Sequence, residues 1–328
     1  MSRRAFAPLA RALADASRAL IRDGVAVVDD ALDASAAREL AREMRALFAS
    51  EGGFERNATV FARAGERFLL EKRGVYEREA HAMTDAQRAL APTFATMDAP
   101  LLGPLNEALG FAGDSALERA SVKLQVSEGG AFPLHFDSDA TLDSRRLTAL
   151  WYLGVGDGEG EVRDWKSGDG GELVFLPFPR PRSQVVIEPR LGRVVLFSSE
   201  FGLHRVLPSL AARRYMFTCW YFAREKRPTQ AAPPPGTDAE SQMAALLHPS
   251  LRKHVAKIVL ADEWAASIEQ AHEESESRAA ALQTHWDEVQ LITRVLVNNY
   301  PLGLERIATE MARGDDGALA DIDWFPNY

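Results

Sequence analysis

Cys219 is the only cysteine in the sequence, so no disulfide can form within the chain. Small secreted domains usually depend on disulfides, whereas proteins of a reducing compartment do not. We therefore expect a cytoplasmic or nuclear protein. Residues 1–6 contain two arginines and no acidic residue, so an organelle-targeting segment is the alternative, although a first helix over residues 9–22 explains this region better.

Long apolar runs and an excess of positive charge are also missing. No stretch of 18 or more apolar residues is present, which argues against a membrane span. The net charge is −9, and non-specific nucleic-acid binding draws on basic surfaces. With 328 residues, of which 46% are hydrophobic, the chain can bury one large core or two modest ones. We expect a soluble globular protein that binds neither nucleic acid nor membranes.

Short runs of β-forming residues fill the middle of the chain. They are separated by Gly, Pro and polar residues, and they lie at residues 146–153, 170–175, 185–187 and 193–197. Such spacing is typical of an antiparallel double-sheet jelly roll. The fold class that we predict is α+β, with a double-stranded β-helix (jelly roll) core, supporting N-terminal helices and a C-terminal helical extension.

The regions before and after these runs follow a helical pattern. A second helix is predicted over residues 35–50, because Leu40, Met44 and Leu47 recur on one face, and this helix should back the larger sheet. The proline-rich residues 226–237 read as a stiff linker. We therefore expect three parts, which are a jelly-roll domain over 1–225, the linker over 226–237 and a helical extension over 238–328.

His135 and Asp137 are two residues apart in a strand-like segment. Successive side chains of a strand alternate between its faces, so these two project the same way and can share one metal ion. A second imidazole from a distant strand would complete a 2-His-1-carboxylate face on non-haem Fe(II), and His204 is the best candidate. The four histidines after residue 222 show no repeating helical spacing, so we expect no second metal site there.

Two blocks, residues 132–137 (FPLHFD) and 204–222, resemble the prolyl-4-hydroxylase-like branch of the Fe(II)- and 2-oxoglutarate-dependent dioxygenases. The resemblance covers about residues 10–225. It implies that His135, Asp137 and His204 are iron ligands, with 2-oxoglutarate and O₂ as co-substrates and ascorbate as the reductant. Because a carboxylate stands at 137, the resemblance is to hydroxylases rather than to the related halogenating enzymes.

The resemblance also implies a binding site for 2-oxoglutarate. Arg214, ten residues after His204, is then the cation that pairs with the distal carboxylate, and a guanidinium suits this role because it binds carboxylates bidentately. Its neighbour Arg213 is the competitor, but strand alternation places Arg213 on the opposite face. The family's other co-substrate positions are occupied in this sequence by Tyr152, Thr218 and Gln125, where the glutamine stands in place of a tyrosine common in close relatives.

Substrate contacts are less clearly marked in the sequence. Asp139 follows the metal motif and reads as a turn residue or a substrate-facing one, and Arg145 points either at the substrate or into solvent. Residues 54–79 carry several arginines among aromatics, and they predict either a substrate-contacting segment over the site or a solvated charged hairpin.

These observations predict a dioxygenase that hydroxylates a peptidyl proline and releases succinate and CO₂. A free amino acid or another small molecule is the alternative substrate. A hypothesis of another class is a non-catalytic jelly-roll adaptor that binds through its helical extension, although such a protein has no need to retain all of His135, Asp137, His204 and Arg214. The sequence leaves open the substrate, the carbon oxidised, the role of the extension and the oligomeric state.

Overall fold

A computed structural model describes residues 7–97, 101–138, 143–157, 160–180, 184–226, 231–313 and 322–326. The helices are α1 (Ala7–Asp23), α2 (Ala34–Phe48), α3 (Asp85–Leu90), α4 (Pro92–Ala95), α5 (Leu102–Leu109), α6 (Ala239–Leu246), α7 (Pro249–Val259), α8 (Ala261–Ala271), α9 (Glu276–Asn299) and α10 (Pro301–Arg313), with the 3-10 turns η2 (Ala80–Ala82) and η3 (Gly113–Ser115). The strands are β1 (Val25–Val28), β2 (Glu55–Arg63), β3 (Glu66–Glu79), β4 (Leu117–Ser127), β5 (Phe132–His135), β6 (Arg145–Gly156), β7 (Leu173–Leu176), β8 (Val185–Ile187), β9 (Val194–Ser198), β10 (Leu203–Val206) and β11 (Arg213–Ala223).

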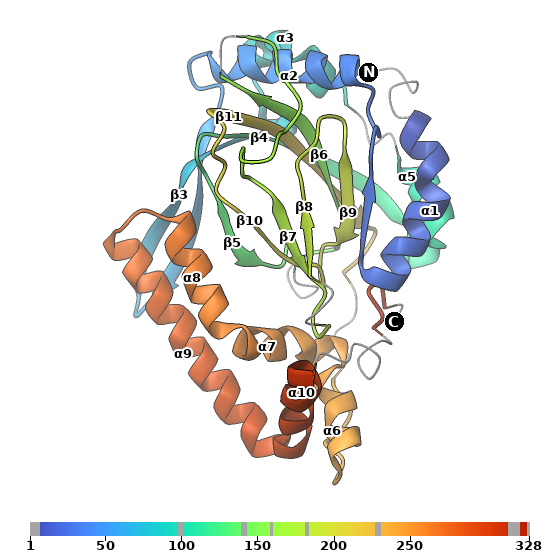
Figure 1. Cartoon of the computed structure of the whole chain (residues 1–328), viewed down its shortest axis with the longest axis vertical. Helices are drawn as coiled ribbons and strands as arrows, with labels where there is room; N and C mark the ends of the chain where they lie inside the picture. The colour runs from blue at the N-terminus through green and yellow to red at the C-terminus, as the bar shows by residue number, and fades with distance from the viewer. Residues whose placement is uncertain are drawn as a thin grey trace.

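Two antiparallel sheets face each other in the centre of the molecule (Figure 1). The major sheet has the strand order β1-β9-β6-β11-β4-β3-β2, and the minor sheet has the order β5-β10-β7-β8. Alternation along β11 sends Met216 into the space between the sheets, where it packs with Tyr152 and Phe175. This arrangement confirms the predicted jelly-roll core.

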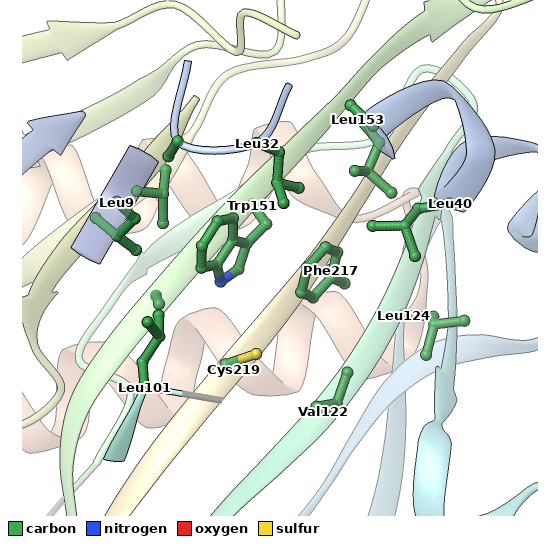
Figure 2. Close-up of a cluster of buried hydrophobic side chains, with 14 of the residues drawn as sticks. Leu9, Leu32, Leu40, Leu101, Val122, Leu124, Trp151, Leu153, Phe217 and Cys219 are labelled. Atoms are coloured by element: carbon green, nitrogen blue, oxygen red, sulfur yellow. The ribbon is translucent and has the colours of Figure 1, made fainter. Parts of the chain in front are cut away.

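The other face of the major sheet carries the larger hydrophobic core. Trp151 and Phe217, on the neighbouring strands β6 and β11, stack with ring centroids 5.7 Å apart (Figure 2). Leu40 of α2 packs into the same cluster, which confirms that this helix backs the major sheet. Cys219 is buried there as well, so its thiol has a packing role, and burial raises its pKa to about 12.

The region expected to contact substrate, residues 54–79, forms the long β2–β3 hairpin at one edge of the major sheet. Its tip is exposed, but its base pairs with β4 next to the space between the sheets. The hairpin is also tied to the C-terminal helices. Arg63 donates to Asp287 of α9 at 2.7 Å, and Nδ1 of His272 donates to the backbone oxygen of Glu71 at 2.8 Å.

Helices α6 to α10 cover the outer face of the minor sheet (Figure 1). Leu134 and Leu203 of that sheet share one hydrophobic cluster with Val255 and Ile307 of the helices. We therefore propose that the extension is an integral layer of the protein, and we keep the boundary at residues 226–237 as a proposal. None of the helices within the described ranges is both long and apolar enough to span a bilayer.

The chain then returns to the N-terminal part of the molecule. Trp324 is 1% exposed and lies against Gly24, where a Cβ would come within 2.5 Å of the indole ring. Phe325 contacts Phe111 with ring centroids 5.6 Å apart. The segment around Trp324 (red) accordingly lies beside α1 in Figure 1. It packs two aromatic side chains against the N-terminal part of the molecule.

Candidate metal centre

Two histidines face each other across neighbouring strands of the minor sheet. His135 is the last residue of β5, and His204 lies opposite it on β10. Their ring centroids are 4.2 Å apart. In each ring Nδ1 donates, at 2.8 Å, to the backbone oxygen two residues earlier, that of Pro133 or Gly202. Because a carbonyl oxygen can only accept, each Nδ1 carries the proton and each Nε2 keeps its lone pair for the site.

Asp137 brings a carboxylate to the same point, although the chain bends after His135 and the strand ends there. Its Oδ1 lies 3.3 Å from Nε2 of His135 and 3.8 Å from Nε2 of His204. The three ligand atoms all lie within 4.8 Å of one another. Electron-rich atoms at this range repel each other unless a proton or a cation lies among them. The arrangement therefore fits a bound cation.

The second oxygen of Asp137 is held by two donors. The hydroxyl of Thr148 donates to Oδ2 at 2.6 Å, and Nε1 of Trp220 donates to the same atom at 3.1 Å. Such outer contacts fix the orientation of a ligating carboxylate. Here they turn Oδ1 toward the two imidazoles.

The pKa values of these groups favour the ligating forms. Burial raises the pKa of Asp137, but the polar contacts with His135, His204 and Thr148 outweigh it, so the pKa of this carboxyl lies well below its ordinary value. Burial, aided by the nearby His135, lowers the pKa of His204 to about 4. At neutral pH the site thus holds a carboxylate and a neutral buried imidazole.

The donor set identifies the metals that fit. Two imidazoles and one carboxylate on one side of an ion are typical of non-haem Fe(II) sites that keep open positions. Structural zinc sites usually take four nitrogen or sulfur ligands, and the buried thiol of Cys219 lies on the opposite face of the major sheet, where it cannot serve as one. His135, Asp137 and His204 are therefore suited to hold Fe(II).

Arg214 is a buried cation without a salt-bridge partner in the described part of the chain. It is 1% exposed, and Nη1 donates to the backbone oxygen of Gly171 at 2.8 Å. Its Nε and Nη2 have no hydrogen-bond partner among the described residues. Burial lowers the pKa of this guanidinium, which nevertheless stays charged at neutral pH. Unpaired donors on a buried cation fit an anionic ligand.

The expected partners of Arg214 lie nearby on the same face. Tyr152 is 1% exposed, burial raises its pKa to about 12, and the nearby charge of Arg214 opposes that rise. The Tyr152 hydroxyl and the Gln125 Nε2 are both buried without a hydrogen-bond partner in the described ranges. Arg213, by contrast, pairs with Glu128 at 2.6 Å, which agrees with its predicted place on the opposite face.

A cavity of about 130 Å³ opens onto the three metal-binding side chains. This is far more than the roughly 10–15 Å³ that one water molecule requires. Gln125 and Thr218 line it, and so do Leu150 and Met216. Tyr152 and Arg214 are not part of the lining. Leu150 and Met216 also pack with Tyr152 between the sheets, and Arg214 lies two residues from Met216 on the same face of β11.

The remaining predicted residues have mixed placements. Arg145 lies over the ring of Trp220 at 4.3 Å from its centroid and donates to the backbone oxygen of Asp137 at 2.7 Å. It therefore lies beside the metal centre rather than in open solvent. Asp139 lies outside the described residues.

Sequence reasoning missed several side chains of this site. Alternation along β11 places Trp220 on the same face as Arg214 and Thr218, and alternation along β6 places Thr148 with Tyr152, but the sequence assigned no role to Thr148 or Trp220. Asn57, Glu77 and Lys123 also line the cavity, from strands that come beside it only through sheet pairing. Asn57 and Glu77 lie in residues 54–79, for which the sequence predicted either substrate contact or a solvated hairpin, but no local pattern marks these two positions or Lys123.

Comparisons with known proteins agree with this geometry. The model of the 2OG-Fe(II) oxygenase superfamily matches residues 122–222, a segment that contains His135, Asp137, His204 and Arg214. A solved prolyl 4-hydroxylase from Phytophthora capsici superposes with a TM-score of 0.69 and 25% identity, covering 95% of this chain and 97% of that one.

Over residues 122–222, the matched segment, the chain is a member of the 2OG-Fe(II) oxygenase superfamily. Among this oxygenase's relatives, Egl nine homolog 1 of Homo sapiens is 26% identical over 208 residues, which are 63% of this chain and 45% of that protein. The Mus musculus protein of the same name is also 26% identical over 208 residues, or 63% of this chain and 48% of that protein. The chain thus spans about half the length of the curated relatives it matches. The Phytophthora structure matches over nearly its whole length, and the similarity is to the prolyl-4-hydroxylase-like branch of the superfamily.

Proposed function

We propose that this protein is an Fe(II)- and 2-oxoglutarate-dependent dioxygenase that hydroxylates a prolyl residue in a peptide. The observation that carries the proposal is the convergence of His135, Asp137 and His204 at a cavity, together with the buried cation Arg214, two of whose nitrogens have no hydrogen-bond partner among the described residues. The similarity to a structure described as a prolyl 4-hydroxylase supports the choice of substrate.

In this proposal the protein residues bind and orient the reactants. His135, Asp137 and His204 hold Fe(II), and Arg214 pairs with the distal carboxylate of 2-oxoglutarate, while Tyr152 donates a hydrogen bond to that carboxylate. Thr218 and Gln125 line the cavity between metal and sheet and contact the same co-substrate. The bound iron and 2-oxoglutarate activate O₂ for hydroxylation of a C–H bond, with succinate and CO₂ as co-products and ascorbate as the reductant. We place the protein in the cytoplasm or nucleus.

Anaerobic titration tests the first step of this proposal. The metal-free protein is titrated with Fe(II) and then with 2-oxoglutarate, and the weak visible absorption of the chelate is recorded. We expect the absorption in the parent, its loss in His204→Ala, and at least a tenfold higher 2-oxoglutarate requirement in Arg214→Ala.

Arg213→Ala is the matched control, because it removes the same charge from the adjacent position on the other face of β11. It should bind 2-oxoglutarate as the parent does. Folded parent protein that gives no absorption contradicts the proposal, and so do equal effects of the two arginine substitutions.

A further inference from the structure

One wall of the cavity carries a network of charged and amide side chains that the metal chemistry does not use. It consists of Asn57 on β2, Lys72, Glu77 and Glu79 on β3, and Lys123 on β4, and we call it the polar wall. Three of its members, Asn57, Glu77 and Lys123, line the cavity that contains the metal-binding residues. Sheet pairing brings it there, since Lys123 lies opposite Thr218 on one side and Glu79 on the other.

The polar wall is internally paired. Nζ of Lys123 lies 3.1 Å from Oε2 of Glu77 and 3.2 Å from Oε1 of Glu79. The amide of Asn57 donates to Glu77 and accepts from Nζ of Lys72 at 2.5 Å. Two ammonium groups thus balance two carboxylates. Such a wall has no net charge to offer to a charged substrate group.

Among the described residues, nevertheless, the polar wall does not use all of its hydrogen-bond donors and acceptors. An ammonium group has three donors, and Lys123 uses two of them on carboxylates. A carboxylate has about four acceptor sites, and Glu77 is engaged by Asn57 and Lys123. One carbonyl oxygen and one N–H can therefore be added without breaking an existing pair. One residue of an extended peptide supplies both groups, because its N–H and C=O point to the same side of the backbone.

Lys123 brings the polar wall close to the metal-binding residues. Nζ lies 5.1 Å from the ring centroid of Trp220, and Nε1 of Trp220 donates to Oδ2 of Asp137 at 3.1 Å. The polar wall is therefore one aromatic side chain away from the metal-binding carboxylate. The apolar part of the lining, Phe132 with Leu150 and Val206, is suited to the ring of the residue to be oxidised.

We infer that Lys123 and Glu77 are specificity-determining residues that bind the neutral backbone C=O and N–H of an extended residue flanking the hydroxylated residue. Lys123 donates to the carbonyl oxygen and Glu77 accepts from the N–H. A free amino acid brings an ammonium and a carboxylate, and each would have to break the Lys123–Glu77 pair to find a counter-charge. The inference rests on the proposed function and assigns its substrate selection to these two side chains.

Binding of two probes tests the inference. They are a proline tripeptide blocked at both ends and N-acetylproline, which keeps a free carboxylate next to the ring. Each is titrated calorimetrically into anaerobic protein with Fe(II) and 2-oxoglutarate. The parent should bind the blocked tripeptide at least tenfold more tightly than N-acetylproline.

Three variants separate selectivity from stability. Glu77→Gln keeps the shape but frees Lys123 for a carboxylate, so the ratio of the two dissociation constants should shift at least tenfold toward N-acetylproline. Lys123→Met should weaken binding of the blocked tripeptide about tenfold. Glu71→Gln is the matched control, because it removes the same charge from β3 at a side chain that pairs with Arg56 outside the cavity lining, and it should change the ratio less than threefold.

The outcomes distinguish this inference from the proposed function. The inference is overturned if the ratio of the two dissociation constants is the same in the parent, in Glu77→Gln and in Lys123→Met. It is also overturned if the parent binds N-acetylproline more tightly than the blocked tripeptide. The visible absorption of the 2-oxoglutarate complex is recorded on the same samples. If it is present, a failure concerns substrate selection alone, whereas its absence from the folded parent overturns the proposed function itself.

Discussion

The backbone N–H of Leu134 donates a hydrogen bond to Oγ of Ser267 at 2.9 Å and so joins the strand that carries His135 to helix α8. Strand β5 is an edge strand of the minor sheet, so this donor has no strand partner on that side. Ser267 is 2% exposed and donates in turn to the backbone oxygen of Trp264 at 2.7 Å. The helical extension thereby satisfies the outer edge of the metal-binding strand.

Ser267→Ala should leave the buried N–H of Leu134 without an acceptor. We expect it to lower the free energy of unfolding by about 1–3 kcal/mol and to weaken Fe(II) binding, because the strand that carries His135 loosens. Urea unfolding and Fe(II) titration measure the two effects. Ser275→Ala, which removes the N-cap of α9, is the control and should lower stability without changing Fe(II) affinity. Identical Fe(II) affinities in both variants would rule out this role for Ser267.

Trp220→Phe should weaken metal binding while keeping an aromatic ring under Arg145. The substitution removes the Nε1 donor to Oδ2 of Asp137, and loss of such an outer contact typically costs about 10–100-fold in metal affinity. Competition with a chelator measures the affinity. Trp165→Phe is the control, since Nε1 of Trp165 donates instead to the backbone oxygen of Gly170. A Trp220→Phe protein that binds Fe(II) like the parent contradicts the assignment.

Lys72 should make the free energy of unfolding depend on pH in the alkaline range. Burial lowers its pKa in the folded state from 10.5 to about 8, opposed by the attraction of Glu77. Between these two values the unfolded chain binds more protons, so the free energy of unfolding should rise with pH, by about 3 kcal/mol in all. Unfolding in denaturant from pH 7.5 to 10.5 measures this slope. In Lys72→Met the free energy of unfolding should no longer rise with pH over this range. If the variant shows the same slope as the parent, Lys72 is not the source of the pH dependence.

Trp324→Ala should destabilise the protein strongly, although residue 324 lies close to the end of the chain. The side chain is 1% exposed, and emptying such a site typically costs about 3–5 kcal/mol. Thermal or denaturant unfolding measures the loss. Trp286→Ala on α9, where the indole is only partly buried, should cost much less. Equal losses would mean that the segment around Trp324 is not part of the core.

Much of the fold and of the site could be predicted from sequence because the relevant patterns are local. Alternation along β11 separated Arg214 from Arg213, and the structure shows the first buried between the sheets and the second paired with Glu128. Helical periodicity placed Leu40 and Met44 of α2 against the major sheet. The side-chain types and strand spacing of His135 and Asp137 indicated a shared metal site, and the structure places their ligand atoms together.

Other features depend on pairing between distant parts of the chain. Lys123 approaches Glu77 and Thr218 only because β4 pairs with both β3 and β11. Ser267 reaches Leu134 only because α8 packs along β5. The register of a sheet and the packing of a helix are set by the whole core, so neighbouring residues in the sequence carry no signal for these contacts.

The sequence by itself determined which side chains can ligate a metal and pair with a carboxylate, because these properties follow from residue type and from the two-residue period of a strand. Only the tertiary structure decided that Thr148 and Trp220 hold Asp137, and that the polar wall faces the same cavity. These contacts join strands that are far apart in sequence, and long-range packing alone fixes their distances.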